Sequence, residues 1–303
     1  MYNLAICIPT YKRLDLLNSL IISILKCNID KSLIEKVNII VVDNDIDRSA
    51  EEIENNLSGS ITGIFSLNYY NYPLKGLSNV RNELINKALL LNPDYLIFID
   101  DDEYVTADWL SELVRVIVRN NGDMAIGPVV SVFDKRISRY ISWWFRRPDY
   151  EDNTKVNYIR TGNLIINTQS LLKFNIRFDN RFNRTGSEDT YFGVQMIKKG
   201  ATVFWAAKAT AYEIVPASRI NLKWLIKRKY RAATTVIFMR KLEKDYYGIL
   251  RKIMGSFFYI ISGIVALIIL LFPVTKKYWG IIKLSEGIGG LAGLFNFKYN
   301  EYQ

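Results

Sequence analysis

Short apolar runs alternate with helical patterns over the first hundred residues, and this alternation limits the chain to few folds. The runs cover residues 4–8, 37–42, 64–69 and 95–99. Apolar residues recur at helical spacing between them, over residues 14–25 and 77–91. Strands that alternate with helices predict an α/β fold, with a mostly parallel, Rossmann-like sheet that carries helices on both faces.

Polar clusters follow three of these predicted strands. The first strand ends at Pro9-Thr10, the second at Asp43-Asn44-Asp45, and the fourth at Asp100-Asp101-Asp102. In open α/β sheets, ligands bind beyond the carboxyl ends of the strands. We therefore expect the three clusters to share one site at one edge of the sheet.

After residue 110 the pattern becomes mixed. We expect helices over residues 109–119 and 190–199, and strands over 125–133, 164–166 and 203–207. Residues 139–150 are aromatic and basic, and we expect a loop there.

Composition excludes several kinds of active site. The 303 residues include no histidine, so a Ser-His-Asp triad, a histidine base and a His-based zinc site are all impossible. Cys7 and Cys27 do not form a metal-site spacing, and we expect both to be reduced packing residues. Because residues 1–6 lead directly into a strand, we expect no signal peptide ahead of the fold.

Positive charge is concentrated next to the most apolar part of the chain. The net charge is +10, and residues 219–252 hold eleven Lys and Arg against two acids. The uncharged run that follows, residues 253–272, is long enough as a helix to span about 30 Å of hydrocarbon. A basic segment beside an apolar run indicates that the partner is membrane lipid and that the chain does not bind nucleic acid. The alternative for 253–272 is a buried core helix.

A second apolar segment, residues 278–295, is rich in glycine and is interrupted by Lys283 and Glu286. We expect an interfacial or re-entrant helix, or the return arm of a hairpin. The domains expected are therefore a catalytic domain over 1–215, a basic amphipathic connector over 216–252, and a membrane-associated region over 253–303.

The acidic run Asp100-Asp101-Asp102-Glu103 directly follows a buried strand. Carboxylates suit Mg²⁺ or Mn²⁺, which proteins commonly hold by one or two such groups plus substrate phosphates. Because alternate residues of an extended chain point the same way, Asp100 and Asp102 can face one ligand. The alternative is a solvated acidic turn that caps the next helix.

A second acidic pair, Glu188-Asp189, lies just before a helical pattern. One interpretation is a plain helix cap. The other is a catalytic base, because direct displacement at a sugar carbon needs one carboxylate to deprotonate the incoming hydroxyl. A metal can stabilise a departing diphosphate, so this chemistry works without histidine.

Five motifs, taken in order, resemble those of family 2 glycosyltransferases of GT-A fold, over roughly residues 1–235. They are Cys7-Ile8-Pro9-Thr10-Tyr11-Lys12-Arg13, Val41-Val42-Asp43-Asn44, Lys75-Gly76-Leu77-Ser78-Asn79-Val80-Arg81-Asn82, Phe98-Ile99-Asp100-Asp101-Asp102-Glu103 and Gly186-Ser187-Glu188-Asp189. Each block alone is weak, but the order and spacing of all five match.

The resemblance implies a role for each matching residue. Asp102 and Asp100 would hold Mg²⁺ or Mn²⁺ in the manner of a DxD motif. Asp189 would be the base of an inverting displacement, with Glu188 beside it. The nucleotide-sugar would be bound by Pro9, Thr10, Arg13, Asp43, Arg81, Asp100, Asp101, Gly162 and Asn163.

The distal segment from Tyr212 looks like that of bacterial exopolysaccharide and cell-surface members. Many members carry a histidine there as a further metal ligand, and this chain has none. Glu213 substitutes for it, or the metal is held more loosely. Acceptor or lipid contacts are expected at Trp143, Trp144, Arg219 and Arg228. The alternative for the two tryptophans is a hydrophobic loop that packs on the domain or lies on the membrane, and for the two arginines a solvated or lipid-facing basic helix.

Taken together, we expect a metal-dependent glycosyltransferase at the cytoplasmic face of the cell membrane. Its partners would be a nucleotide-sugar donor, most simply UDP-linked, a glycan or lipid-linked acceptor, and membrane lipid. One alternative is a sugar nucleotidyltransferase, which would need a glycine-rich phosphate loop where Pro9-Thr10-Tyr11-Lys12-Arg13 stands. Another is an inactive, membrane-bound scaffold that keeps the fold.

Overall fold

The computed structural model describes residues 1–269 and 274–297 and divides into two compact units. The first contains residues 1–132, 147–183 and 188–214. The second contains residues 133–146, 184–187 and the chain from Val215 onward. The expected boundary at 215 lies next to this division, and residue 252 lies inside a helix. The functional division of the chain stays a prediction.

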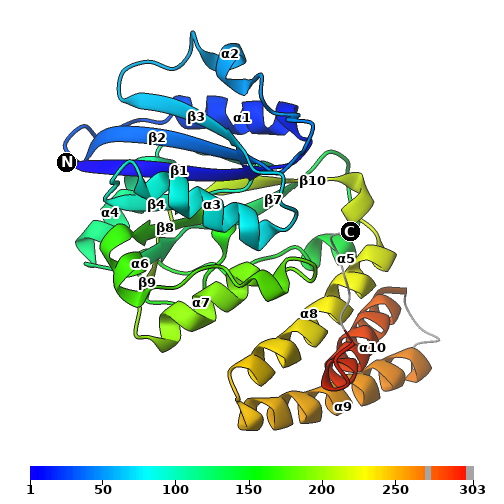
Figure 1. The fold of residues 1–303 in the computed structure, drawn as a ribbon. Coiled ribbons are helices and arrows are strands. Elements are labelled where there is room, and N and C mark those ends of the chain that lie inside the picture. The colour runs from blue at the N-terminus through cyan, green and yellow to red at the C-terminus, as the bar shows by residue number, and fades with distance from the viewer. Residues whose placement is uncertain (270–273, 298–303) are drawn as a thin grey trace. The chain divides into compact units, whose positions relative to one another are not determined.

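A seven-stranded sheet with the order β3-β2-β1-β4-β8-β6-β9 forms the centre of the first unit (Figure 1). All pairs are parallel except those that β8 makes with β4 and β6, so the expected mostly parallel sheet is confirmed. The strands are β1 Tyr2–Thr10, β2 Ile34–Asp43, β3 Phe65–Asn71, β4 Tyr95–Phe98, β6 Met124–Ile126, β8 Leu164–Asn167 and β9 Val203–Trp205.

Helices cover both faces of this sheet because its strands are apolar on both faces. Leu4, Ile6 and Ile8 pack into one core and Ala5 and Cys7 into the other, as the two-residue period of a strand requires. The helices on the first face are α1 Leu14–Leu25, α2 Ile53–Leu57 and α4 Trp109–Arg119. Those on the second are α3 Leu77–Leu89, α6 Thr168–Phe174 and α7 Glu188–Lys198.

Two expectations about the middle of the chain are wrong. The single strand over 125–133 breaks at Gly127-Pro128 into β6 and β7 (Val129–Phe133), which belong to different sheets. A Cβ atom on Gly127 would lie 2.2 Å from the carbonyl oxygen of Ala209, so the backbones approach too closely for any side chain there. Residues 139–150 are not all loop, because α5 (Arg139–Trp143) begins at the N-cap Ser138.

A small second sheet with the order β5-β10-β7 extends the first unit. It joins β5 (Glu103–Val105) to β10 (Ala211–Val215) in antiparallel register, with Glu103 opposite Glu213. Residues more than a hundred positions apart are thereby set side by side, beginning with the last residue of the acidic run that follows β4.

The second unit is built mainly from three long helices, α8 (Leu222–Leu242), α9 (Tyr246–Ile269) and α10 (Val274–Leu294). Helix α10 packs on both α8 and α9, and it approaches α9 closely where Gly280 meets Gly263. Tyr246–Ile268 is the one helix in the described residues that is long and apolar enough to cross a bilayer. The expected run over 253–272 thus begins earlier, and its end at 270–272 lies outside the described residues.

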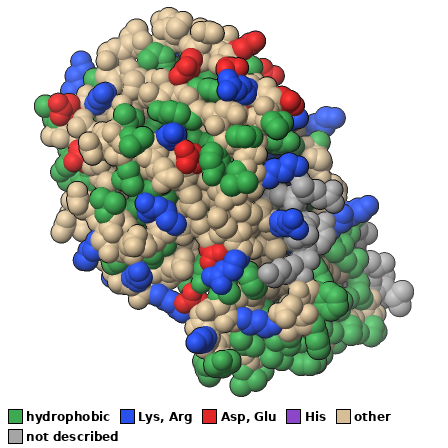
Figure 2. Space-filling view, in the orientation of Figure 1, with side chains coloured by type: hydrophobic (Ala, Val, Ile, Leu, Met, Phe, Trp, Pro, Cys, Tyr) green, Lys and Arg blue, Asp and Glu red, His purple; other side chains and the backbone are tan. Residues whose placement is uncertain are grey.

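The outward side of α9 is apolar and is not covered by the other helices. Its exposed side chains include Met254, Phe257, Phe258, Ile261 and Ile268. Figure 2 shows hydrophobic side chains gathered over the region that α9 occupies in Figure 1. A core helix of a soluble protein would be mostly buried, so this exposure argues against the alternative of a buried helix.

Candidate active site

Arg13 joins the end of β1 to the acidic run after β4. Its Nη1 atom lies 3.0 Å from Oδ1 of Asp101 and 3.0 Å from Oδ2 of Asp102. The hydroxyl of Thr10 donates to the other oxygen of Asp101 at 2.9 Å. Asp101 and Asp102 are both buried, so these bonds compensate carboxylates that would otherwise be costly. The structure therefore brings four of the predicted site residues together.

Arg81 makes a second link, from the acidic run to the start of α7. Its Nη2 atom lies 3.0 Å from Oδ1 of Asp100, and its Nη1 atom donates to Oε1 of Glu188. Burial by itself would lower the pKa of Arg81, but the charges of Asp100 and Glu188 outweigh that effect and raise it, so the guanidinium stays charged. Burial raises the pKa of Glu188, and the Arg81 charge opposes that rise.

Two polar atoms of the Arg81–Glu188 pair could each still form a hydrogen bond. Nε of Arg81 and Oε2 of Glu188 are buried and have no hydrogen-bond partner among the described residues. A buried acceptor without a donor costs about 1–3 kcal/mol. Such a cost is commonly retained where a ligand supplies the missing partner.

The start of helix α3 explains why Arg81 is held so firmly. Oδ1 of Asn183 accepts the backbone N–H groups of Ser78 at 3.0 Å and Asn79 at 3.3 Å, and so caps the helix from a distant part of the chain. A Cβ atom on Gly76, whose φ is 122°, would lie 2.3 Å from Cγ of Asn183. The glycine is therefore needed both for its dihedral angle and for this close approach.

Negative charge accumulates around Asp102. Burial raises the pKa of Asp102 to about 7, and the charges of Asp100, Asp101 and Glu213 add to the rise. The pKa of Glu103, which is buried beside them, is raised well above its usual value for the same reasons. Excess carboxylate charge of this kind fits a bound cation.

The number of protein ligands for such a cation is small. Among the described residues, no three acidic or sulfur side chains converge with metal-ligand geometry. Proteins usually bind Mg²⁺ through one or two carboxylates, and substrate oxygens complete the coordination shell of the ion. Glu213 does lie in this region, but it is bonded to Arg147 and Ser131.

Gly162 and Asn163 are both close to the site, in different ways. A Cβ atom on Gly162 would lie 2.6 Å from Oε1 of Glu103 and 3.4 Å from Oδ2 of Asp100. The amide of Asn163 is 1% exposed and makes three bonds inside the protein. It accepts from Nε1 of Trp109 at 2.8 Å, and it donates to the carbonyls of Pro128 at 3.1 Å and Ala209 at 2.7 Å.

Asp43 is also engaged by its own surroundings. The β1–β2 register places it beside Thr10, with Pro9 beside Val42. Its fully buried carboxylate accepts hydrogen bonds from the backbone N–H groups of Asp45 and Ala50, both at 2.9 Å, and from the hydroxyl of Tyr69 at 3.0 Å. These bonds shape the loop that follows β2.

Asp189 lies in the first turn of α7, where a carboxylate interacts favourably with the helix dipole. It is partly exposed, and its Oδ1 atom accepts from the backbone N–H of Thr190 at 2.6 Å. Its charge acts on both arginines: it helps to raise the pKa of Arg81, and it opposes the lowering of the pKa of Arg160. A partly exposed carboxylate is suited to accept a proton from a ligand.

The aromatic and basic residues predicted to contact acceptor or lipid lie in the second unit. Trp143 is exposed and meets Trp144 edge-on at 4.9 Å, and Nζ of Lys229 lies 5.3 Å from the Trp144 ring. The guanidinium of Arg228 lies 4.9 Å from the Trp224 ring. Arg219 ends the short 3₁₀ helix Ala217–Arg219.

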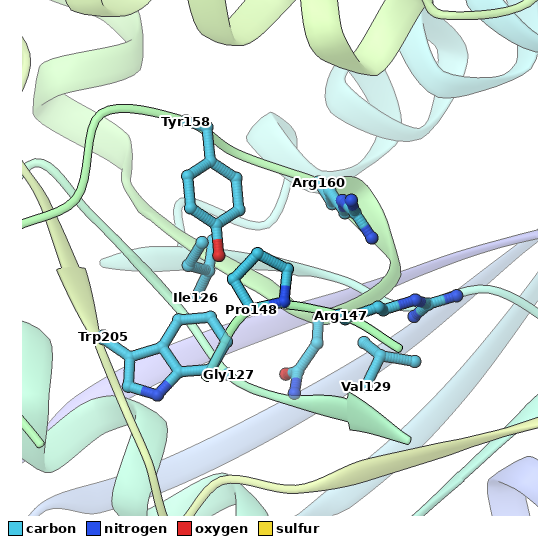
Figure 3. Close-up of a pocket in the computed structure, with 9 residues that line it drawn as sticks. Ile126, Gly127, Val129, Arg147, Pro148, Tyr158, Arg160 and Trp205 are labelled. Atoms are coloured by element: carbon cyan, nitrogen blue, oxygen red, sulfur yellow. The ribbon is translucent and has the colours of Figure 1, made fainter. Parts of the chain in front are cut away.

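One pocket of the first unit was not expected from the sequence. Tyr158, Arg160, Arg147 and Trp205 line a cavity of about 20 Å³. Figure 3 shows how these side chains lie around it. Its walls come from β6, β9 and the segment before Gly162, which are distant in the chain. The only local signal was the position of Arg160, directly before Thr161-Gly162-Asn163.

Comparison with known proteins gives the family. Residues 5–179, more than half of the chain, match glycosyl transferase family 2. The chain is similar to the succinoglycan biosynthesis protein ExoM of Rhizobium meliloti (strain 1021), with 29% identity over 232 residues, or 75% of this chain and 71% of ExoM.

Solved structures with the same fold are more distant in sequence. S. aureus TarS 1–349 in complex with UDP-GlcNAc is similar at 13% identity and a TM-score of 0.56, over 99% of this chain and 94% of that one. This chain spans only 39% of a longer TarS chain, which it matches at 16% identity over 75% of its own length with a TM-score of 0.55.

GalNAc-T7, solved with UDP, GalNAc and Mn²⁺, is similar at 14% identity and a TM-score of 0.54, over 78% of this chain and 50% of that one. The motifs, the sheet order and these likenesses agree with one another. The chain therefore belongs to glycosyl transferase family 2 and is a glycosyltransferase built on the GT-A fold.

Proposed function

We propose that this glycosyltransferase moves a sugar from a UDP-sugar to an acceptor hydroxyl, with inversion, during synthesis of a surface polysaccharide or lipid-linked glycan. The observation that carries the proposal is the position of Arg81, which bonds Asp100 at the end of β4 and Glu188 at the start of α7. The guanidinium of Arg81 thus joins a residue predicted to bind the donor to the acidic pair predicted to contain the catalytic base. ExoM, named for succinoglycan biosynthesis, and TarS, solved with UDP-GlcNAc, support the choice of product and donor.

The donor would lie across the carboxyl ends of β1, β2 and β4. Thr10, Arg13 and Asp101 form one bonded group there, next to the loop that Asp43 holds in place. Arg13 and Arg81 would supply positive charge toward the diphosphate. Gly162 would leave room for the donor sugar beside Asp100, because any side chain there meets Glu103.

The carboxylates of Asp100 and Asp102 would hold Mg²⁺ or Mn²⁺, for which the excess negative charge around Asp102 provides a reason. A divalent cation there supplies Lewis-acid stabilisation of the diphosphate that leaves the sugar. GalNAc-T7 was solved with Mn²⁺. Asp102 would have to exchange part of its bond to Arg13 for the cation.

Asp189 would act as the base. The acceptor oxygen forms a bond to the anomeric carbon, the bond from that carbon to the diphosphate oxygen breaks, and the acceptor proton passes to the Asp189 carboxylate. The unpartnered Oε2 of Glu188 would accept a hydrogen bond from the same acceptor and orient it. Arg81 would hold Glu188 in place throughout.

A test compares UDP release from UDP-sugars, with Mn²⁺ present, by the intact chain and by Asp189→Asn. We expect a loss of roughly 10²–10⁴-fold, because a positioned base contributes that much, while UDP binding changes little. Asp15→Asn, in the first turn of α1, is the matched control and should keep full activity. Unchanged release by Asp189→Asn would remove it from the base role. Failure of the intact chain to bind any nucleotide with metal would favour an inactive scaffold.

Membrane attachment would use the exposed apolar side of α9. The basic stretch 219–252 would lie on anionic headgroups and keep the active site on the cytoplasmic side. We expect the full chain to co-sediment with vesicles of phosphatidylglycerol. Phe257→Glu combined with Ile261→Glu should abolish that co-sedimentation, because both side chains are exposed on α9.

A further inference from the structure

The pocket in Figure 3 holds two arginines on the same side, with the rings of Tyr158 and Trp205 on the other. Arg147 is paired with Glu213. Arg160 makes no ion pair or hydrogen bond with the residues that the structure describes, and it remains open to solvent. A ligand could therefore reach its guanidinium directly.

The two guanidinium groups repel one another. Arg160 is exposed as a whole, but its neighbours partly desolvate the guanidinium and thereby lower its pKa; the charge of Arg147 lowers it further, while Asp189 and Glu213 only partly offset this. Like charges held together at a partly desolvated site are relieved by a bound anion, and two arginines match the oxygens of a phosphate or carboxylate.

Trp205 forms part of the aromatic wall, and its ring meets Tyr150 edge-on at 5.4 Å. In Figure 3 its indole nitrogen lies on the side of the ring away from the arginines. The cavity itself holds about 20 Å³, which is room for one water molecule. An anion would therefore lie at its mouth, between the guanidinium groups, with the aromatic rings beside it.

This mouth borders the reacting groups and includes Asn163, which is predicted to bind the nucleotide-sugar. It belongs to the other half of the sheet from Thr10 and Asp43, the residues predicted for the nucleotide itself. Arg160 comes two residues before Gly162, which faces Glu103 and Asp100. The pocket walls come from β6 and β9, whereas Thr10 and Asp43 lie on β1 and β2, on the far side of β4 and β8. A group bound by the arginines would thus be near the acidic site without lying in the nucleotide half.

We propose that Arg147 and Arg160 bind an anionic group, a phosphate or carboxylate, on the acceptor. The inference rests on the proposed function and adds to it the chemical class of acceptor: a glycan or lipid-linked chain that carries negative charge near the hydroxyl to be glycosylated. Arg147 has a second role, since it also holds Glu213, so Arg160 is the more specific probe of the ligand.

The test titrates inorganic phosphate, and separately acetate, into the full chain saturated with UDP and Mg²⁺, with binding followed by calorimetry and tryptophan fluorescence. Saturation with UDP fills the nucleotide and diphosphate part of the donor site, so the added anion does not report binding there. We expect binding that Arg160→Gln weakens about tenfold, the value of one charge-assisted hydrogen bond, and that Arg160→Lys weakens less. Arg119→Gln, an exposed arginine of α4, is the matched control and should change nothing.

Three results would overturn the inference. The UDP-saturated chain could bind neither anion, or it could bind one with an affinity that neither Arg160→Gln nor Arg147→Gln alters. The variants could instead weaken UDP itself by the same factor, which would assign the arginines to the donor. A chain that binds UDP but no anion keeps the proposed function and loses only this inference. A chain that binds no UDP loses the proposed function first.

Discussion

Removing one partner of the buried pair of Arg81 and Glu188 should cost far more stability than breaking any exposed ion pair of the same unit. The two side chains are only 4% and 3% exposed. Arg81→Met would leave the Glu188 carboxylate buried without a counter-charge, and would also remove the 3.0 Å contact to Asp100. Loss of one partner of a buried pair costs about 3–5 kcal/mol, so we expect the free energy of unfolding to fall by that amount.

A double-mutant cycle separates the pair from its surroundings. Glu188→Gln alone should cost about 1.5–3 kcal/mol, because it removes a charged hydrogen bond but leaves Arg81 paired with Asp100. In the Arg81→Met background the same change should cost little or be stabilising, because the neutral amide no longer needs a guanidinium. The coupling energy should therefore be roughly 2–3 kcal/mol.

Guanidinium chloride unfolding of the full chain in detergent, followed by tryptophan fluorescence, measures these values. Lys87 and Glu83 provide the matched control, since they form an i,i+4 pair on the same helix α3 at 3.3 Å. Their partly exposed pair should be worth only about 0.3–0.5 kcal/mol. A cost below about 1 kcal/mol for Arg81→Met, or energies that simply add in the double variant, would refute the argument from burial.

Three further changes test the site and the sheet that carries it. Gly162→Ala should cut UDP release roughly tenfold or more, measured by enzyme assay, because its Cβ displaces Glu103. Asn163→Ala should lower the unfolding free energy by about 2–4 kcal/mol in denaturant titrations, since it leaves Nε1 of Trp109 unpaired. The pKa of Asp123 is lowered overall: burial by itself would raise it, but the hydrogen bonds from Ser170 and Thr202 outweigh burial. Asp123→Asn should therefore lower the free energy of unfolding by about 1 kcal/mol near pH 7. Unfolding curves measured at several pH values should show this difference disappear as the pH falls below about 4, because Asp123 is then protonated.

The central sheet and its ligand-binding edge could be predicted from local pattern. Residues 4–8 alternate between two cores with the period of a strand, and polar residues follow where each strand ends. The absence of histidine removed competing mechanisms before any geometry was known. These inferences held for the fold because each depends on neighbours within a few residues. The break at Gly127 has no such local signal, because it results from a close approach to Ala209.

The sequence by itself therefore determined the order of strands and helices, the acidic run after β4, and the apolar segment that forms α9. Only the tertiary structure decided what each polar side chain bonds. Asn163 holds Trp109, Asn183 caps α3, and β10 sets Glu213 opposite Glu103. Each of these contacts joins residues separated by fifty or more positions. Periodicity and motif spacing describe how a segment folds along itself, whereas such contacts depend on how the sheet pairs its strands and leave no local pattern.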